Sequence, residues 1–338
     1  MRTARLIAPE RIELIDTPLP PAPAAGEAMV KVKAVGICGT DMHIFKGERA
    51  DVALPRVMGH ELSGVVHQVG EGVTHLAPGD RVVFDPVMAC GKCSVCRKGR
   101  PNVCAEVRCY GVQMDGAFRD YITVPAKQLY VLPEGIELDH AALAEPFSIA
   151  ANILSRADVQ SGESVLVMGS GTIGLCLVQA LKGIGARVLV SDVVASKLET
   201  ARSFGSDATV NSATEDLVAA AQAFAPDGLD VIIEAVGVTP LTQLAILDLA
   251  TPTARIVVLS FDNRPMQIPP VCITKKELSI LGSRMNAGRF PLVLEWLEKR
   301  MIHPEKMISR VYPVEQIQQA FENALADSTL MKTLITFD

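Results

Sequence analysis

The sequence lacks an excess of positive charge, an apolar run of signal-peptide length in its first residues, and repetitive composition. Lysine and arginine number 32 against 38 aspartates and glutamates, which gives a formal net charge of -6. A nucleic-acid-binding domain usually presents a basic face, so this balance argues against a nucleic-acid partner. The N-terminal segment MRTARLIAPERIEL has no apolar core of signal-peptide length, so we expect no export signal and a cytoplasmic protein. We find no internal repeat and no low-complexity segment.

A membrane-spanning run is also missing. The stretch that comes nearest, residues 165–181, carries no charged residue. It is shorter than a helical span of about 20 residues, and Gly169, Ser170, Gly171 and Gly174 interrupt it. We therefore expect no membrane partner.

What the chain does have is enough length and apolar content for two domains. It contains 338 residues, of which 49% are hydrophobic and 21% charged. Up to about residue 145, short β-type runs alternate with glycine and proline, which is typical of an irregular β domain. From Ser148 to Arg284, short apolar strands alternate with helical stretches, and this pattern predicts a doubly wound parallel α/β sheet. The six expected strands are SVLVMG, RVLVSD, DATVN, LDVIIEAV, ARIVVLS and LSILGS.

The segment after Arg284 is mixed. The apolar spacing of FPLVLEWLEKRMI predicts a helix, which Pro304 ends. The spacing of VEQIQQAFENAL predicts a second amphipathic helix. KTLITF is an apolar closing strand that needs a partner. We expect it to return to the first domain, so that the six-stranded unit is inserted within that domain.

Four of the eight cysteines lie within fifteen residues, in the pattern C-x2-C-x2-C-x7-C. A zinc-thiolate site needs four sulfurs in a tetrahedron, and short spacings let one loop surround the ion. Four thiolates leave no open position, so a zinc ion here would be structural. Two disulfides, or a zinc ribbon on nucleic acid, are the alternatives. Clustering in a large acidic chain for which we expect no export signal disfavours both. The cysteines are Cys90, Cys93, Cys96 and Cys104.

A second set of metal-ligand types lies in GICGTDMH and GHE. Cys38 offers a soft thiolate and His60 an imidazole. A carboxylate from Glu61 or Glu145 could complete three protein ligands, which leaves the fourth position that a catalytic zinc requires. A lone cysteine in a glycine-rich loop is more often a packing residue. The catalytic interpretation is favoured only because these residues occur together in a chain that also contains the four-cysteine cluster.

A glycine-rich turn follows the strand SVLVM and precedes a helix. In G-x-G-x-x-G, Gly169 makes the tight turn, Gly171 lets a pyrophosphate approach the backbone and Gly174 lets the helix pack on the strand. Asp192 ends the next strand, where an acid hydrogen-bonds the adenosine ribose and repels a 2′-phosphate, which selects NAD over NADP. The alternative for Asp192 is the N-cap of the following helix.

The order of these motifs resembles the zinc-containing medium-chain alcohol dehydrogenases over essentially the whole length. GHELSGVVHQVGEGV, GDRV, GICGTDMH, the four-cysteine lobe, GSGTIG and Glu-Ala-Val-Gly all follow the family's order. The resemblance implies a GroES-like catalytic domain from residues 1–147 and 286–338, with a structural zinc lobe at about 88–106. It also implies a Rossmann NAD-binding domain at 148–285, two zinc ions per chain and a homo-oligomer, dimer or tetramer.

The resemblance also assigns roles to residues. Cys38 and His60 are similar to catalytic-zinc ligands, and Glu61 is similar to the third ligand of the sorbitol-dehydrogenase-like branch. Glu145 resembles an acid that binds zinc directly or holds its water, so the choice between the two carboxylates stays open. Thr40 resembles the hydroxyl that takes the alcohol proton, and His43 the outer end of the proton relay. The predicted cofactor-binding residues are Gly169, Gly171, Thr172, Ile173, Gly174, Asp192 and Val236.

Within the family, EPFSIAANI, PNVC and LSILGSRMNAGRFP are most similar to bacterial starvation-sensing and hexonate dehydrogenases, which include enzymes acting on L-gulonate, L-galactonate or L-idonate. We therefore expect a secondary hydroxyl of a sugar acid to be oxidised by NAD to a keto-acid. Arg284 follows the sixth strand, where a guanidinium could grip a carboxylate by two hydrogen bonds, with Asn286 close behind. Arg284 could instead bind the cofactor or pack at a domain seam.

Two other functions remain open from the sequence. A polyol or L-threonine dehydrogenase is the nearest enzymatic alternative. Polyol dehydrogenases tend to carry an arginine followed by an aromatic residue around the sixth strand, whereas in this chain Arg284 is followed by methionine. A relative that has lost catalysis and serves as a regulator is an alternative of another class. The presence of Cys38, Thr40, His43, His60 and Glu145 argues against that second alternative.

Overall fold

The computed structural model describes residues 1–338, which form two compact units. One unit comprises Met1–Glu145, Asn286–Glu298 and His303–Asp338, and the other comprises Pro146–Met285 and Lys299–Ile302. The second unit thus interrupts the first along the chain. None of the helices combines the length and the apolar character needed to cross a membrane.

A seven-stranded sheet forms the centre of the first unit. Its order is β16-β17-β3-β4-β5-β9, and β8 also pairs with β3. The strand at the end of the chain, β17, runs antiparallel to β3 with Leu334 opposite Gly36. The expected return of the closing strand to the first domain is therefore confirmed. The strands are β3 (Glu27–Gly36), β4 (Glu61–Val69), β5 (Arg81–Phe84), β8 (Tyr121–Pro125), β9 (Leu129–Val131), β16 (Ile308–Pro313) and β17 (Lys332–Thr336).

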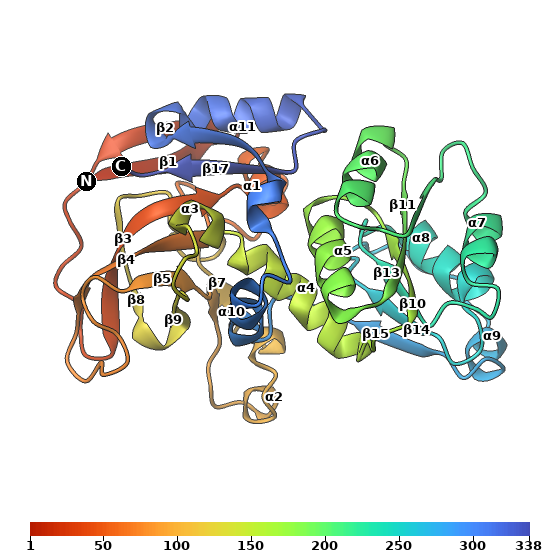
Figure 1. Ribbon diagram of the computed structural model, residues 1–338. Helices are drawn as coiled ribbons and strands as arrows, with labels where there is room; N and C mark the ends of the chain where they lie inside the picture. Colours follow the sequence, from red (N-terminus) through yellow and green to blue (C-terminus); the bar gives the residue numbers. More distant parts are fainter. The chain divides into compact units, whose positions relative to one another are not determined.

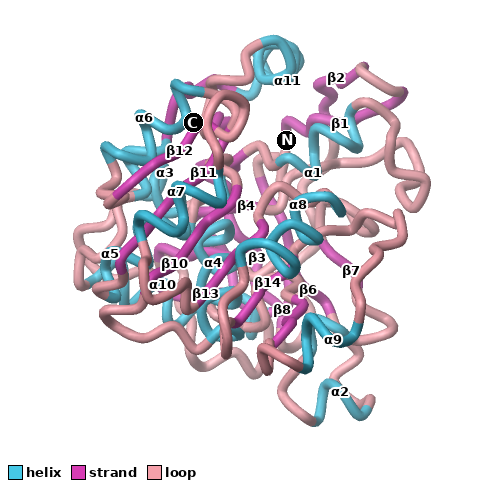
Figure 2. Tube along the Cα trace, turned by 90° about the vertical axis from the view of Figure 1, so that its right-hand side faces the viewer, coloured by secondary structure: helices cyan, strands magenta, loops and turns pink.

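Short elements surround this sheet. Both helices expected after Arg284 are present, and the first of them buries Phe290, Val293, Trp296 and Leu297. Two further antiparallel pairs complete the unit, β1 (Arg2–Ala8) with β2 (Arg11–Asp16) and β6 (Val87–Met88) with β7 (Arg108–Cys109). The helices are α1 (Gly39–Phe45), α2 (Ser94–Arg97), α3 (Leu138–Ala141), α10 (Phe290–Glu298) and α11 (Ile317–Ala326), with 3-10 turns η1 (Pro101–Val103), η2 (Ala126–Gln128), η4 (Pro304–Met307) and η5 (Val314–Gln316). The segment that carries α2 projects from the rest of this unit in both views (Figures 1 and 2).

The second unit contains the six-stranded parallel sheet that the apolar runs predict. Its strand order is β12-β11-β10-β13-β14-β15, and every neighbouring pair is parallel. The central strand β10 is buried along its whole length, as expected for a parallel strand covered on both faces. The strands are β10 (Ser164–Met168), β11 (Arg187–Asp192), β12 (Ala208–Asn211), β13 (Val231–Glu234), β14 (Arg255–Val258) and β15 (Ser279–Gly282).

Helices cover both faces of this sheet. In Figure 1, α5 and α6 lie on one side of the strands and α7 and α8 on the other. Leu166, Met168 and Ile232 point to the side of α7 and α8, where they belong to one apolar cluster. Each such side chain contributes about 1.5–3 kcal/mol when fully buried. The helices are α4 (Ala144–Ala157), α5 (Thr172–Ile184), α6 (Ala195–Ser203), α7 (Leu217–Phe224), α8 (Thr239–Leu244) and α9 (Pro270–Thr274), with a π-helical turn η3 (Ala245–Leu249).

The strand order reverses between β10 and β13. From β10 the chain runs outward to β11 and β12, and it then returns to the other side of β10 to form β13, β14 and β15. In open parallel sheets a ligand binds outside the carboxyl ends of the strands at such a reversal. The segments that follow β10, β11 and β13 are therefore where a nucleotide is expected.

Candidate active site and metal centres

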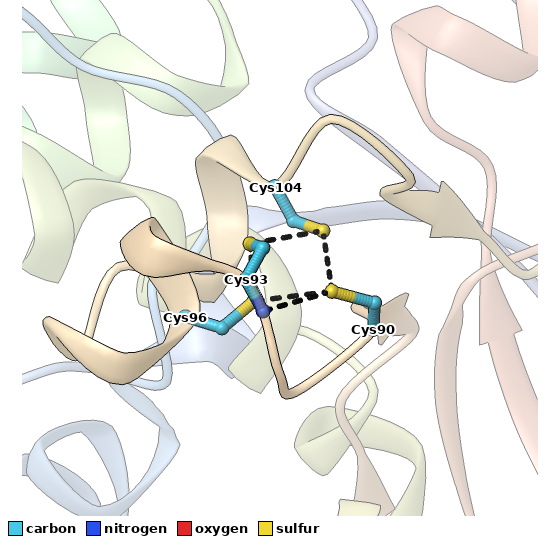
Figure 3. Close-up of side chains that lie close together, drawn as sticks. All are labelled: Cys90, Cys93, Cys96 and Cys104. Carbon is cyan, nitrogen blue, oxygen red and sulfur yellow. Dashed lines mark hydrogen bonds between the residues drawn. The ribbon is translucent and has the colours of Figure 1, made fainter.

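The four lobe cysteines converge on one point (Figure 3). Their Sγ atoms are 3.4 Å apart for Cys93 and Cys96, 3.5 Å for Cys90 and Cys104, 3.8 Å for Cys93 and Cys104, and 4.0 Å for Cys90 and Cys96. A Zn–S bond of about 2.3 Å in a tetrahedron places two sulfurs about 3.8 Å apart. A disulfide needs about 2.05 Å between sulfurs, so these distances fit a tetrahedral zinc site and exclude two disulfides.

The electrostatics of the lobe also suit a cation. Backbone N–H groups of Lys92 and Cys93 lower the pKa of Cys90 to about 7. Burial, followed by the neighbouring Cys93 thiol, raises the pKa of Cys96 to about 12. The Cys96 thiol thus resists ionisation among its neighbouring sulfurs. A divalent cation removes that resistance because a coordinating thiol is deprotonated outright.

A second cluster joins Cys38, His60 and Glu61. One ligand atom from each of the three side chains lies within 4.8 Å of the others. Cys38 immediately precedes α1, and Glu61 is the first residue of β4, with His60 just before it. The end of β3 and the start of β4 are paired at Gly36 and Glu61, and this pairing brings the two segments together. His60 and Glu61 are buried, while Cys38 is partly exposed.

Asp41 organises this cluster from within α1. Its side chain is fully buried. One carboxylate oxygen accepts a hydrogen bond from the Cys38 N–H at 2.9 Å, and the other accepts one from the Gly59 N–H at 3.3 Å and lies 3.6 Å from His60 Nδ1. Burial alone lowers the pKa of His60, but Asp41 and Cys38 outweigh it and raise that pKa well above its usual value. The surroundings of His60 therefore favour positive charge, as a metal site does.

Two buried polar atoms of this cluster have no hydrogen-bond partner, His60 Nδ1 and Glu61 Oε2. The other oxygen of Glu61, Oε1, is 2.7 Å from Lys332 Nζ. Buried polar atoms are normally paired, so unpaired ones call for an explanation such as an ion. A thiolate, an imidazole and a carboxylate are the ligand types of a zinc site with an open position, so the residues present fit such an ion.

Glu145 lies near the cluster but outside its set of three ligands. It is the second residue of α4 and is buried. Burial is the main cause that raises its pKa to about 7; His60 and Lys332 oppose this rise, and Glu61 adds to it. Of the two carboxylates considered from the sequence, the structure therefore groups Glu61 with Cys38 and His60.

The two expected relay residues share the short helix α1. Thr40 is its second residue and is partly exposed, and His43, three positions later, is exposed. Residues three apart lie on one face of a helix. His43 Nδ1 is 2.6 Å from Glu48 Oε2. If Nδ1 carries the proton, Glu48 accepts it in this bond, and Nε2 is the ring nitrogen left to accept another.

The glycine turn after β10 has the backbone that its sequence predicts. Gly169 has φ of +99°, and a Cβ there would come within 2.7 Å of Val236. A Cβ on Gly174 would lie 1.9 Å from the Gly169 carbonyl oxygen, so only glycine fits against the turn. Gly171 is exposed, is the N-cap of α5, and would meet nothing within 4 Å. The first turn of α5, with Thr172 and Ile173 partly exposed, is thus open to an anionic ligand.

Asp192 ends β11, the strand next to β10. Its Oδ2 accepts hydrogen bonds from Ser170 N at 2.7 Å and Ser170 Oγ at 2.8 Å, and its Oδ1 accepts one from Val194 N at 3.0 Å. Burial alone would raise the pKa of Asp192, but these bonds, with a smaller contribution from Lys197, lower it. The N-cap of α6 is Val194, so Asp192 does not cap that helix.

Val236 follows β13, the strand on the other side of β10. Glu234, fully buried at the end of β13, accepts hydrogen bonds from the N–H groups of Val236 and Gly237 at 2.9 and 2.6 Å. This local bonding shapes the turn and leaves the Val236 side chain 51% exposed. Gly169, Asp192 and Val236 therefore lie at the carboxyl ends of three adjacent strands, at the same edge of the sheet.

The two residues expected to bind substrate, Arg284 and Asn286, both follow β15, but their surroundings differ. Asn152 Nδ2 donates to the carbonyl oxygens of Arg284 and Met285 at 3.1 and 2.8 Å, and the Arg284 side chain is exposed. Asn286 is only 1% exposed. Its Nδ2 donates to Asp85 Oδ1 at 2.8 Å and its Oδ1 accepts from Gly288 N at 2.9 Å. Because the protein uses both polar ends of Asn286, we leave Asn286 out of the proposed substrate site.

Sequence reasoning did not single out Asp41 or Lys332. Asp41 lies inside the quoted motif GICGTDMH, and an acid in a glycine-rich segment beside a metal ligand was a usable signal. Lys332 had no local signal, because its partner Glu61 is 271 residues away in the chain.

Comparison with known proteins agrees with this geometry. Residues 24–134 match the alcohol dehydrogenase GroES-like domain, and residues 172–299 match the zinc-binding dehydrogenase domain. The chain is 39% identical to the starvation-sensing protein RspB of Escherichia coli K12, covering 100% of this chain and 99% of that protein. It is 37% identical to 2-dehydro-3-deoxy-L-galactonate 5-dehydrogenase of Pseudoalteromonas atlantica, covering 93% and 92% respectively.

A solved structure extends the likeness to three dimensions. It is the NADH complex of an alcohol dehydrogenase (rspB) of Escherichia coli CFT073, with 39% identity, coverage of 100% of this chain and 99% of that one, and a TM-score of 0.93. The chain belongs to the zinc-type medium-chain alcohol dehydrogenase family. It is therefore an oxidoreductase of the zinc-binding dehydrogenase type, with a GroES-like domain and a Rossmann domain.

Proposed function

We propose that this enzyme transfers a hydride from a secondary alcohol of a sugar acid, a hexonate such as L-gulonate or L-galactonate, to NAD and so forms the keto-acid. Cys38, His60 and Glu61 would hold the catalytic zinc, and the four lobe cysteines would hold a second, structural zinc. The observation that carries the proposal is the cluster of three ligands with two buried, unpaired atoms, His60 Nδ1 and Glu61 Oε2.

The number of protein ligands distinguishes the cluster proposed to be catalytic from the one proposed to be structural. Four thiolates would fill the four positions of a zinc ion, whereas three protein ligands would leave one position open. A zinc ion in the three-ligand cluster would supply Lewis-acid stabilisation of the negative charge that develops on the alcohol oxygen. The chain's own residues would move the proton: the Thr40 hydroxyl takes the alcohol proton while releasing its own, and His43 accepts the released proton and passes it on toward solvent. Glu48, bonded to His43 Nδ1, keeps Nε2 as the accepting nitrogen.

The nucleotide-binding edge supports NAD as the hydride acceptor. Open backbone at Gly171 and the N-terminus of α5 suit a pyrophosphate. The carboxylate of Asp192 is held in its ionised form, which suits ribose hydroxyls and repels a 2′-phosphate. Val193, the next residue, is 61% exposed and apolar, so this position offers no charge to a 2′-phosphate.

A carboxylate on the substrate is supported by Arg284 and by the relatives. Arg284 follows the carboxyl end of the edge strand β15, and Asn152 holds its backbone. A guanidinium can bind a carboxylate through two parallel hydrogen bonds, which a neutral polyol cannot match. The relative from Pseudoalteromonas atlantica is named for a sugar acid.

The test is comparative kinetics with NAD on an aldonate and on the matching alditol. We expect kcat/KM to favour the aldonate, and Arg284→Ala to remove that preference by raising KM for the aldonate alone. Arg289→Ala is the matched control, because Arg289 is also exposed and lies five residues further along. A clear preference of the wild type for the alditol, or an equal loss on both substrates in Arg284→Ala, contradicts the sugar-acid assignment.

A polyol or L-threonine dehydrogenase is the alternative within the enzyme class. The same kinetics, extended to hydroxy amino acids, separates it from a hexonate dehydrogenase. An inactive regulatory relative is excluded if purified protein with two zinc ions per chain forms NADH on any member of this panel.

A further inference from the structure

We infer that Lys332, on the last strand of the chain, is a positioning residue that holds Glu61 by one carboxylate oxygen and reserves the other for the catalytic metal. The inference rests on the proposed assignment of Cys38, His60 and Glu61 as metal ligands. It adds a residue that touches neither the metal nor the substrate.

The contact between Lys332 and Glu61 is buried and specific. Lys332 is 2% exposed and Glu61 is 1% exposed. Lys332 Nζ donates to Glu61 Oε1 at 2.7 Å and to the Ile37 carbonyl oxygen at 3.0 Å. Ile37 directly precedes Cys38. The ammonium group of Lys332 therefore contacts the backbone next to one proposed metal ligand, Cys38, and the side chain of another, Glu61.

The second oxygen of Glu61 is confined by the backbone. Gly36 is the register partner of Glu61 in the pair β3–β4, and Leu334 of β17 is paired with Gly36. A Cβ on Gly36 would lie 1.9 Å from Glu61 Oε2, so that oxygen occupies the space that any other residue would fill. Lys332 on one side and Gly36 on the other fix the orientation of the carboxylate. Oε2 is left buried and without a hydrogen bond.

This arrangement answers a charge problem that a metal-binding carboxylate creates. A buried carboxylate needs a compensating charge. If Lys332 bonded both oxygens, Glu61 could not bind a metal; with no lysine, the carboxylate would have no fixed direction before the metal arrived. Partners that orient metal ligands in this way are worth about 10–100-fold in metal affinity.

The strand that carries Lys332 does not need the ion pair for its own attachment. β17 is paired through its backbone with β3 on one side and with β16 on the other. Another lysine, Lys33 on β3, reaches Asp338 at 3.9 Å with 35% of its side chain exposed. That pair also joins β3 to the end of the chain, but it lies at the surface. Lys33 is therefore a matched control for charge removal without a metal ligand as partner.

The experiment measures zinc retention in purified zinc-loaded enzyme, using a chelator titration and cobalt substitution followed by visible spectroscopy. The variants are Lys332→Met, Glu61→Gln, their combination and Lys33→Met. We expect Lys332→Met to lose the zinc of the three-ligand cluster at a chelator concentration roughly 10–100-fold lower than the wild type, and to keep the lobe zinc. Its cobalt spectrum should change, and Lys33→Met should behave as the wild type.

The double variant of Lys332→Met and Glu61→Gln tests whether Lys332 acts through Glu61. Once Glu61 is glutamine, there is no carboxylate to orient, so adding Lys332→Met should cause no further loss of zinc. This comparison remains available if Lys332→Met alone does not fold, because the combination buries no unpaired charge. The inference is overturned if Lys332→Met lowers only the melting temperature and leaves zinc affinity and the cobalt spectrum unchanged. It is also overturned if Lys332→Met weakens zinc binding equally with Glu61 or glutamine present. If instead His60→Ala leaves the zinc content of the enzyme unchanged, the proposed catalytic site itself fails.

Discussion

The two candidate metal clusters of this chain differ in their number of ligands: one offers four and would be closed, and the other offers three and would be open. The lobe offers four sulfurs and nothing else, while the second cluster offers one sulfur, one nitrogen and one oxygen. Both lie in the unit that contains the GroES-like sheet. Zinc itself has no redox chemistry, so the ligand set decides whether it stabilises a fold or activates a substrate.

The clusters also differ in how the chain assembles them. All lobe ligands lie within one short segment around α2, which projects from its unit (Figure 1). The second cluster draws its residues from the turn before α1 and the start of β4, and Lys332, which contacts Glu61, is the first residue of β17. A local loop can surround an ion by itself, but the second cluster exists only once the sheet has formed. Variants of the two clusters should therefore have different consequences, and we order them by their effect on turnover.

The largest effect is expected from His60→Ala. It removes a ligand from the open cluster, so kcat should fall roughly 10³-fold or more, because the Lewis acid contributes several kcal/mol to the transition state. Zinc per chain should drop from two to one, measured by mass spectrometry of the purified protein. A near-normal kcat in His60→Ala would show that the catalytic assignment is wrong.

Asp41→Asn should have a smaller effect on the same cluster. The substitution keeps the shape of the side chain but removes the charge beside His60 and weakens its bonds to the Cys38 and Gly59 N–H groups. We expect zinc affinity and kcat/KM to fall by about 10–100-fold, measured by chelator titration and steady-state kinetics. Asp51→Asn, which alters an exposed acid paired with Arg49, is the control. An equal loss of zinc affinity in Asp51→Asn would contradict the role given to Asp41.

Asp192→Ala tests the nucleotide edge while leaving both clusters intact. We expect KM for NAD to rise about tenfold, because a charge-assisted bond to the ribose is worth about 1.5 kcal/mol, and discrimination against NADP to relax. Zinc content should stay at two. Ser170→Ala keeps the Asp192 carboxylate and removes the single hydroxyl hydrogen bond to it, so it should preserve the NAD preference. A wild type with higher kcat/KM for NADP contradicts this account of Asp192.

Cys93→Ser should have the smallest effect on turnover and a large one on stability. Loss of a thiolate opens the lobe, and structural zinc contributes folding free energy directly. We expect the melting temperature to fall by about 5 °C or more, measured by calorimetry. The KM values of the enzyme that remains folded should match the wild type, and a changed KM for the alcohol would show that the lobe takes part in substrate binding.

The sequence was most informative where partners are close in the chain or buried in a regular pattern. The lobe followed from the spacing of its cysteines, and β10 to β15 followed from their apolar runs. The glycine turn was predictable because the space around Gly169 and Gly174 admits no side chain. Each of these features depends on a short segment.

Long-range polar contacts were not predictable in the same way. Nothing near Lys332 indicates Glu61, and nothing near Asn286 indicates Asp85, 201 residues earlier. Only the paired strands β17, β3 and β4 bring the first pair together. The choice between Glu61 and Glu145 was open for the same reason. The substrate, the oligomeric state and the compartment stay predictions.

The central claim, one closed and one open zinc site in each chain, is tested most directly by anomalous diffraction at the zinc absorption edge from crystals of the purified enzyme. We predict two peaks per chain, one among Cys90, Cys93, Cys96 and Cys104 and one at Cys38, His60 and Glu61. A single peak in the lobe, from protein that still oxidises alcohol with NAD at the normal rate, would contradict the account.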